Sequence, residues 1–153
     1  MTEQKQELIF RIGRFDQEYK WSAGEVGSKF FIALRDEGKI LGSKTKSGRV
    51  LVPPRSFDED RFEPTEGLVE VGPEGEIVTF SVSYLNPDAS PRDEPWAVGI
   101  IKLDGADTGM MHTIQGVANP AKDLQIGMRV KAIFKAPEDR RGEILDISHF
   151  EPV

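Results

Sequence analysis

The sequence predicts a mainly β protein, in which a helix and a hairpin segment precede five strands that form a small barrel. Two observations carry this prediction. Apolar residues recur at four-residue spacing over residues 23–37, which is typical of a helix that packs along one side. From residue 75 onward, runs of strand-forming residues alternate with turns that contain glycine, proline or aspartate, which is typical of a small antiparallel barrel.

The helix is expected at Ala23–Glu37. Ser22-Ala-Gly-Glu25 has the S-x-x-E form of a capping box, and Gly38 is well placed as the C-terminal cap. Three apolar residues mark the buried side: Val26, Phe30 and Leu34. Ahead of the helix, Gln6–Phe15 mixes apolar and charged residues. Two interpretations of that segment stay open, a short local strand and an arm that docks on a neighbour.

The segment after the helix has the outline of a zinc ribbon. Two strand-like arms, Lys39–Lys44 and Arg49–Val52, flank a knuckle, and a second knuckle follows at Asp58–Arg61. A zinc ribbon binds its metal through two pairs of cysteines, but this sequence has no cysteine. The expected ligand positions hold Lys44, Ser47, Asp58 and Arg61. Ammonium and guanidinium groups are not ligands for a cation, so we expect no zinc here. In place of a metal, we expect the ribbon to be held by turn chemistry, by packing and by an ion pair between Asp58 and either Lys44 or Arg61.

The second half of the sequence predicts the barrel. Five strands are expected in it, at Gly75–Tyr84, Trp96–Leu103, Met110–Val117, Met128–Lys135 and Glu143–Phe150, and Leu68–Val71 is expected to begin the same all-β region. We expect a loop at Asn86–Pro95, a turn at Asp104–Gly109 and a short helical turn within Ala118–Gly127. Periodicity alone leaves the barrel type open.

Five segments together resemble a known family: WSAGEVGSKFFIALRDEGKILG, GRVLVPPRSF, VEVGPEGEIVTFSV, LQIGMRVKAIF and ILDISHFEPV. They are similar to the zinc-ribbon plus OB-fold proteins that accompany thiolase-like enzymes acting on acyl-CoA. The resemblance covers residues 19–153, and VPPR after the first knuckle is its most specific part. It implies an N-terminal unit at residues 1–67, with a degenerate, rubredoxin-like ribbon, and a five-stranded OB-fold domain at residues 68–153. The loss of all four cysteines is where this chain departs from the family.

Charge divides unevenly between these two units. The chain has a net charge of −6, and residues 68–153 carry all of it, because basic and acidic residues balance in residues 1–67. Proteins that bind nucleic acid normally present a basic surface, so the acidic second half disfavours that function. No apolar run reaches the roughly 20 residues that cross a membrane. The first residues lack the pattern of a signal peptide, so a cytoplasmic location is expected.

The sequence gives little support to catalysis by the chain alone. Thiol chemistry is excluded, and the histidines, His112 and His149, are expected to be structural. Asp104 and Asp107 could act as paired catalytic carboxylates or as metal ligands, but within D-G-A-D-T-G they are more naturally turn-forming residues. No glycine-rich phosphate loop follows a strand and opens a helix.

The resemblance implies a non-catalytic accessory subunit of a thiolase, acyltransferase or aldolase complex, in which the partner enzyme supplies the reactive groups. Acyl-CoA is then the expected shared ligand, with no tightly bound cofactor. The candidate contacts for its phosphates are the basic residues of the ribbon, Lys44, Lys46, Arg49 and Arg55. A solvated basic face is the plainer interpretation. The alternative function is an OB-fold module for single-stranded nucleic acid, with bases stacked on Phe80, Tyr84 and Trp96.

Overall fold

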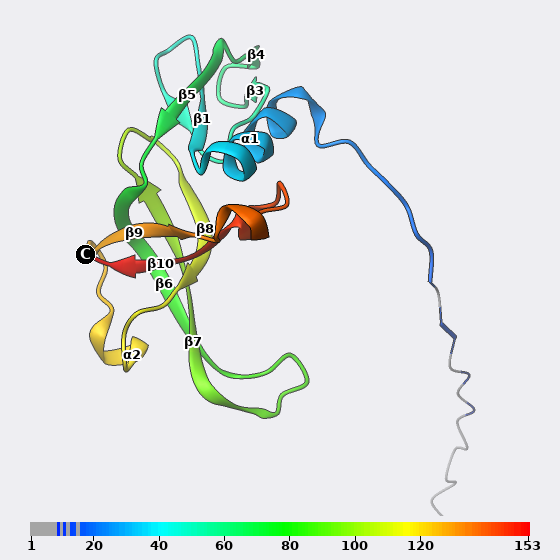
Figure 1. The fold of residues 1–153 in the computed structure, drawn as a ribbon, viewed down its shortest axis with the longest axis vertical. Helices are drawn as coiled ribbons and strands as arrows, with labels where there is room; N and C mark the ends of the chain where they lie inside the picture. The colour runs from blue at the N-terminus through cyan, green and yellow to red at the C-terminus, as the bar shows by residue number, and fades with distance from the viewer. Residues whose placement is uncertain (1–8, 10, 12, 15) are drawn as a thin grey trace, which may run out of the picture.

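The protein is described by a computed structural model that covers residues 9, 11, 13, 14 and 16–153. An extended N-terminal segment leads into helix α1 and a small sheet at one end of the molecule, and a barrel forms the rest (Figure 1). The elements are α1 (Gly24–Glu37), β1 (Ile40–Lys44), β2 (Val50–Leu51), β3 (Phe57–Asp58), β4 (Glu63–Pro64), β5 (Gly67–Val71), β6 (Glu74–Leu85), β7 (Pro91–Leu103), β8 (Gly109–Ile114), α2 (Pro120–Asp123), β9 (Arg129–Phe134) and β10 (Ile147–Pro152). Two single 3₁₀ turns, η1 (Pro137–Asp139) and η2 (Ile144–Asp146), precede β10.

Helix α1 confirms the predicted span to within one residue. Phe30 and Leu34 are buried, and Gly38 adopts the left-handed conformation that ends the helix, with φ of 64°. The predicted capping box is wrong. Ala23 is the N-cap residue and already has near-helical angles, so Ser22 lies one position too early to cap the first turn. Its Oγ instead accepts a hydrogen bond from the N–H of Gly24 at 3.1 Å.

The small sheet has the strand order β2-β1-β5, and β3 and β4 form a separate hairpin. The β1–β2 hairpin and the β3–β4 hairpin occupy the two predicted knuckle positions. Strand β5 pairs with β1 from Ile40–Val71 to Lys44–Gly67. The sequence predicts Leu68–Val71 as the start of the barrel region, but its hydrogen bonds attach it to β1 of the ribbon. Periodicity identifies a strand without identifying its neighbour. The division of the chain at residue 67 stays a prediction.

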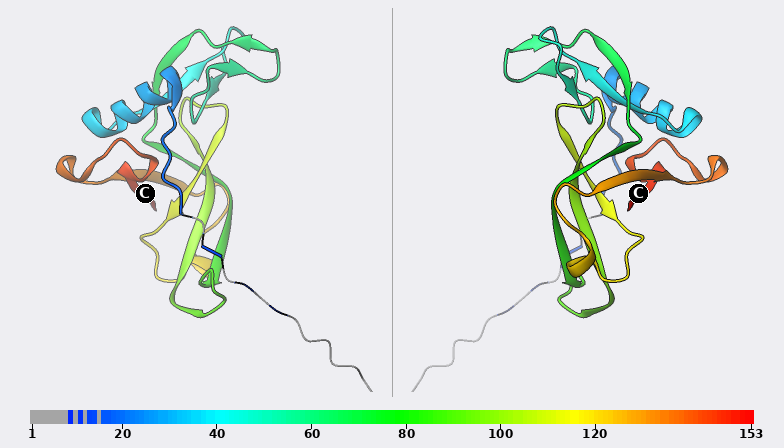
Figure 2. Two further views of the ribbon diagram at one scale, coloured as in Figure 1. Left: turned by 90° about the vertical axis from the view of Figure 1, so that its right-hand side faces the viewer. Right: turned by 90° about the vertical axis from the view of Figure 1, so that its left-hand side faces the viewer.

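The barrel closes in the order β10-β8-β7-β6-β9, which is the strand order of an OB fold. Its antiparallel meander β6-β7-β8 is joined to β9 through Glu74–Glu76 and to β10 through the parallel pair Ile114–Phe150. The five-stranded prediction is therefore confirmed. Figure 2 shows that the β6–β7 hairpin runs well beyond the other strands.

Several boundaries in the barrel differ from the prediction, the two largest differences being at the starts of β7 and β10. The expected loop Asn86–Pro95 shrinks to Asn86–Ser90, because Leu85 pairs with Pro91 and β7 continues through Pro95. Strand β7 contains Pro91 and Pro95, which have no N–H group to donate. They interrupt no hydrogen bonds with β8, because β8 pairs with β7 only from Ala97 onward. The strand expected at Glu143–Phe150 begins later, since η2 occupies Ile144–Asp146.

One apolar core joins the ribbon end to the barrel. Phe30 and Leu34 of α1 belong to the same buried cluster as Val52 of the ribbon and Ile77 and Phe150 of the barrel. Burial at roughly 25 cal/mol per Å² of apolar surface makes this shared core the main source of stability. Within the part of the chain that the structure describes, no helix is both long and apolar enough to span a membrane.

Asp146 organises the loop that lies under α1. Its buried carboxylate accepts hydrogen bonds from the N–H groups of Arg141 at 2.8 Å, Gly142 at 2.7 Å and Glu143 at 3.2 Å. Burial raises the pKa of this carboxyl, but the three backbone donors lower it further, so its net pKa is below the usual value. The loop thereby presents η2 to the helix, with which it is in contact.

We predict that Asp146→Ala lowers the free energy of unfolding by about 1–3 kcal/mol at neutral pH, because three buried N–H groups lose their acceptor. The folded-state pKa is depressed, so this stabilisation is present above the unfolded value of 3.8 and is lost as pH falls through the lower folded value. Denaturant unfolding at a series of pH values measures both effects. Asp139→Ala, at an exposed position of the same loop, is the control and should change little. An equal loss in both variants would contradict the assignment.

Candidate functional site

The first ribbon turn is held by side-chain hydrogen bonds around Thr45. This residue is fully buried, and its Oγ1 accepts the N–H of Arg49 at 3.0 Å and lies 2.9 Å from the Ser47 Oγ. Backbone bonds join the Thr45 N–H to the Arg49 carbonyl at 2.8 Å and the Gly48 N–H to the Thr45 carbonyl at 2.9 Å. The turn chemistry expected at this knuckle is therefore present, and it is centred on Thr45.

The second turn is fixed by Asp58, a carboxylate that is only 2% exposed. Its Oδ1 accepts the N–H of Asp60 at 3.1 Å, and it lies 4.0 Å from the guanidinium of Arg49. Arg49 also forms an ion pair with Asp60. The cation beside Asp58 is thus Arg49 rather than the expected Lys44 or Arg61. Because Arg49 directly precedes β2 and Asp58 ends β3, this contact joins the two hairpins.

The residues at the former ligand positions do not fit zinc. Lys44 and Arg61 supply cations, Ser47 bonds within its own turn, and Asp58 alone offers a carboxylate. Among the residues that the structure describes, no three His, Cys, Asp or Glu side chains gather closely enough to hold a metal. Hydrogen bonds within the turns and ion pairs between the two hairpins occupy the positions at which the resemblance to a zinc ribbon would place thiolates.

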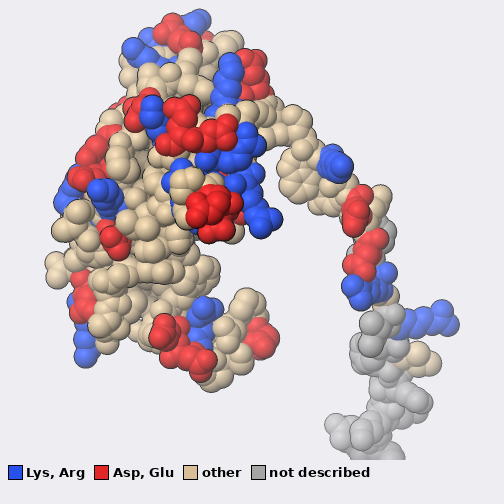
Figure 3. Space-filling model, in the orientation of Figure 1, with Lys and Arg blue, Asp and Glu red and all other residues tan. Residues whose placement is uncertain are grey.

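The four predicted phosphate contacts lie around these two turns, three of them beside acids. Lys46 pairs with Glu63 at 3.0 Å, Arg49 with Asp60, and Arg55 with Glu59. Lys44 is exposed and has no ion pair within the described part of the chain. Figure 3 shows basic and acidic side chains intermixed at this end of the molecule. These four cations therefore lie on a surface of mixed charge.

Exposed aromatic residues gather on the same part of the chain. Phe62 is 80% exposed and packs edge-on against Phe57, with ring centroids 6.2 Å apart. Phe62 has a φ of 54°, a left-handed conformation that a bulky residue adopts at a cost. A glycine or asparagine would close this hairpin turn with less strain. Hairpin geometry therefore does not explain why an aromatic residue stands there.

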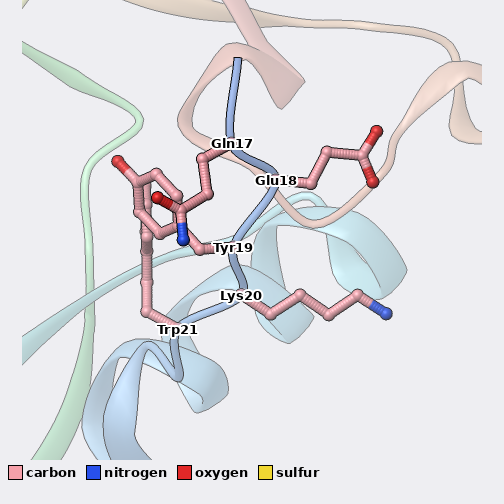
Figure 4. Close-up of a pocket in the computed structure, with 5 residues that line it drawn as sticks. All are labelled: Gln17, Glu18, Tyr19, Lys20 and Trp21. Carbon is pink, nitrogen blue, oxygen red and sulfur yellow. The ribbon is translucent and has the colours of Figure 1, made fainter. Parts of the chain in front are cut away.

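A second aromatic pair precedes α1. Tyr19 and Trp21 are largely exposed, and their ring centroids are 5.0 Å apart. In this extended segment they share one side of the backbone with Gln17, while Glu18 and Lys20 point to the other side (Figure 4). Among the aromatic residues of α1, Phe30 enters the core and Phe31 is half-buried, so the exposed pair consists of Tyr19 and Trp21.

The aromatic residues suggested for binding single-stranded nucleic acid do not lie on one face of the barrel. Phe80 pairs with Gly99 on the inward face of the sheet, and Tyr84 shares its strand parity. Trp96 pairs with Ser83 and lies on the opposite face, where Arg92 covers its ring at 5.4 Å. A cleft beside Trp96 is bounded by Gln115, Gly116 and Pro120. Phe80, Tyr84 and Trp96 therefore form no common stacking platform.

The two histidines differ in their surroundings. His112 is buried against Phe150 with ring centroids 5.6 Å apart, and this burial lowers the pKa of its imidazole. It is therefore neutral near pH 7 and has no carboxylate partner in the described chain. The His149 Nδ1 lies 3.1 Å from the neighbouring Ser148 hydroxyl, and its Nε2 lies 3.9 Å from the Glu151 carboxylate.

The sequence analysis missed the contact that mounts the ribbon on the barrel. Asp107 and Thr108, in the β7–β8 turn, bind the free edge of β2. The Asp107 Oδ2 accepts the Val50 N–H at 2.8 Å, and the Thr108 Oγ1 both accepts the Val52 N–H at 2.7 Å and donates to the Val52 carbonyl at 3.0 Å. The turn was predicted correctly. Its partner lies more than fifty residues away, and no local signal identifies it.

We predict that the purified protein contains no zinc bound by the ribbon, since hydrogen bonds replace the ligands. Elemental analysis after dialysis should find no stoichiometric metal, and a chelator should leave the melting temperature unchanged. Asp58→Ala should lower the melting temperature, because it removes the acceptor that joins the hairpins. Glu66→Ala, at an exposed ribbon residue, is the control. One zinc per chain, lost together with ribbon structure, would refute the prediction.

Comparisons with known proteins agree with this architecture. Residues 68–135 match the family described as the ChsH2 C-terminal OB-fold domain. A DUF35 domain-containing scaffold protein of Methanocaldococcus jannaschii is 27% identical over 104 residues, which are 67% of this chain and 72% of that protein.

Two solved structures share the fold. A DUF35-family protein of unknown function from Sulfolobus solfataricus matches with a TM-score of 0.61 and 27% identity, covering 72% of this chain and 78% of its own. The Ltp2–ChsH2(DUF35) aldolase matches with a TM-score of 0.58 and 17% identity, covering 82% and 93%. The chain is therefore similar to DUF35 proteins in sequence and fold, and its barrel matches the ChsH2 OB-fold domain.

Proposed function

We propose that this chain is a non-catalytic accessory subunit of a thiolase-like enzyme, which it helps to assemble and whose acyl-CoA site it helps to frame. The observation that carries the proposal is its similarity to a protein described as a scaffold. The aldolase named with the second structural neighbour agrees with the enzyme class that the sequence resemblance implies. The chemistry of the chain is consistent with this role, because it has no cysteine and its buried histidine is neutral.

The ribbon end is the proposed enzyme-facing side. Tyr19, Trp21, Phe57 and Phe62 expose aromatic surface there, and Ile32 adds a half-exposed apolar side chain on α1. Aromatic anchors surrounded by charged residues are typical of protein interfaces. The strained, exposed Phe62 is the strongest single candidate, since a left-handed phenylalanine in a hairpin turn weakens the isolated chain.

The ribbon cations are the proposed contacts for the phosphates of coenzyme A. Lys44 is available without breaking an ion pair of the described chain, and Lys46, Arg49 and Arg55 lie around the same two turns. A phosphate would replace Glu63, Asp60 and Glu59 as the acceptor for these cations. Guanidinium groups bind phosphate in a bidentate manner, which favours that exchange when a partner enzyme holds the ligand in place.

Assembly with an enzyme is the direct test of the function. We predict that the chain alone turns over no acyl-CoA thioester, and that it forms a stable complex with a thiolase-like enzyme encoded beside its gene. Activity should appear or rise in that complex, because the enzyme supplies the thiol nucleophile. Turnover by the isolated chain, or failure of the two proteins to bind, would refute the proposal.

A matched pair of variants locates the interface in this experiment. Phe62→Gly removes the exposed ring and relieves the left-handed strain, so the isolated chain should be at least as stable while the complex weakens. Ala89→Gly relieves the same kind of strain, with φ of 65°, at the tip of the β6–β7 hairpin. It should leave assembly unchanged. Equal affinity of both variants for the enzyme would place the interface elsewhere.

The phosphate contact is tested with Lys44→Ser, Lys46→Ser and Arg55→Ser combined, which leaves Arg49 to hold the turns. Each lost charge-assisted contact is worth about 1.5–3 kcal/mol. Because a tenfold change in affinity corresponds to about 1.4 kcal/mol, the assembled complex should bind acyl-CoA at least tenfold more weakly. Lys102→Ser, Lys122→Ser and Lys131→Ser combined remove the same charge from exposed barrel positions. If the two triple variants bind acyl-CoA equally well, the ribbon is not the phosphate contact.

A further inference from the structure

The β6 strand has an open edge along the outer half of its length. On one side it pairs with β7 from Gly75 to Leu85. On the other side it pairs with β9 only through Glu74–Glu76, and Ile77 then exchanges backbone bonds with Gly127 and Met128. From Val78 onward, this second side has no backbone partner within the described part of the chain. The exposed stretch belongs to the hairpin that projects past the barrel (Figure 1).

Open strand edges normally carry features that prevent pairing with another strand, such as lysine, proline, inward-pointing charge or bulges. The segment Ile77–Leu85 contains neither a charged residue nor a proline. Its bulges lie only at the two ends, where the register with β7 shifts between Ile77 and Thr79 and between Ser83 and Leu85. The run Thr79–Ser83 between them is therefore regular, uncharged and free to add a strand.

The side chains of this run suit a copy of the same segment. Phe80 and Val82 lie on one face and are half-buried, and Ser81 and Ser83 lie on the other. In an antiparallel pair centred on Val82, Phe80 faces Tyr84 of the other copy and Ser81 faces Ser83. Phe80 then meets Tyr84, Val82 meets its own counterpart and Ser81 meets Ser83, and no charges oppose each other within the run.

We propose that two copies of this chain associate through antiparallel pairing of their β6 edges, centred on Val82, to form one continuous sheet. The pairing supplies backbone partners to the open edge and extends the half-buried face of Phe80 and Val82 across the two copies.

The experiment measures molar mass by light scattering over a dilution series, with two charged versions of the edge. The wild type should reach twice the chain mass of 17.1 kDa at high concentration. Ser81→Lys with Ser83→Lys should give a monomer, and so should Ser81→Glu with Ser83→Glu, because each places like charges opposite one another. Mixing the two variants should restore a dimer, since lysines then face glutamates.

Matched controls separate edge pairing from a general effect of charge. Leu145→Lys with Ser148→Lys adds the same charge at exposed positions away from the edge and should still dimerise. Hydrogen exchange gives a second readout, in which edge amides within Thr79–Ser83 are protected in the wild type and lose protection in the lysine variant. A wild type that stays monomeric, or a mixture of the charged variants that does not associate, would overturn the proposal. If the wild type is monomeric and the Ser81→Lys with Ser83→Lys variant no longer binds the enzyme, the proposal is also overturned, because the β6 edge then binds the enzyme.

Discussion

The mounting of the ribbon on the barrel depends on the free edge of β2. A strand of two residues has almost no ladder of its own, and its outer N–H and carbonyl groups would lose free energy if they were buried without partners. Asp107 and Thr108 supply those partners from the β7–β8 turn. Val52, which lies between them and the core, is buried in the cluster that includes α1 and the barrel. Hydrogen bonding and apolar burial therefore fix the same junction.

This junction explains how a small ribbon stays ordered without four thiolates. A structural zinc would supply much of the folding free energy of such a module. Here the contributions are distributed: Thr45 closes one turn, Asp58 closes the other, and Arg49 lies between the two hairpins. Each exposed pair contributes little on its own. The larger contribution comes from Val52, which is buried in one cluster with Leu34 and Ile40, and from the fully buried Leu51.

The two proposed surfaces lie at opposite ends of the molecule. The ribbon end carries the strained Phe62, the exposed Tyr19–Trp21 pair and the clustered cations, whereas the open β6 edge belongs to the hairpin at the far end (Figure 1). Because the barrel separates them, one chain has room to bind an enzyme and a second copy at the same time. The pairing of the ribbon cations with acids also means that phosphate binding would be a competition between acceptors rather than a simple attraction.

The sequence alone determined the elements whose signals are local. Four-residue spacing and a terminal glycine gave α1, and strand periodicity gave the five barrel strands, because side-chain burial repeats with backbone geometry. The absence of cysteine excluded a thiolate site without any structure. The tertiary structure decided which segments meet: β5 with β1, Asp107 with Val50, and Arg49 rather than Lys44 with Asp58. These contacts join residues that are distant along the chain, and the free energy that selects them arises only when both segments fold against the same core.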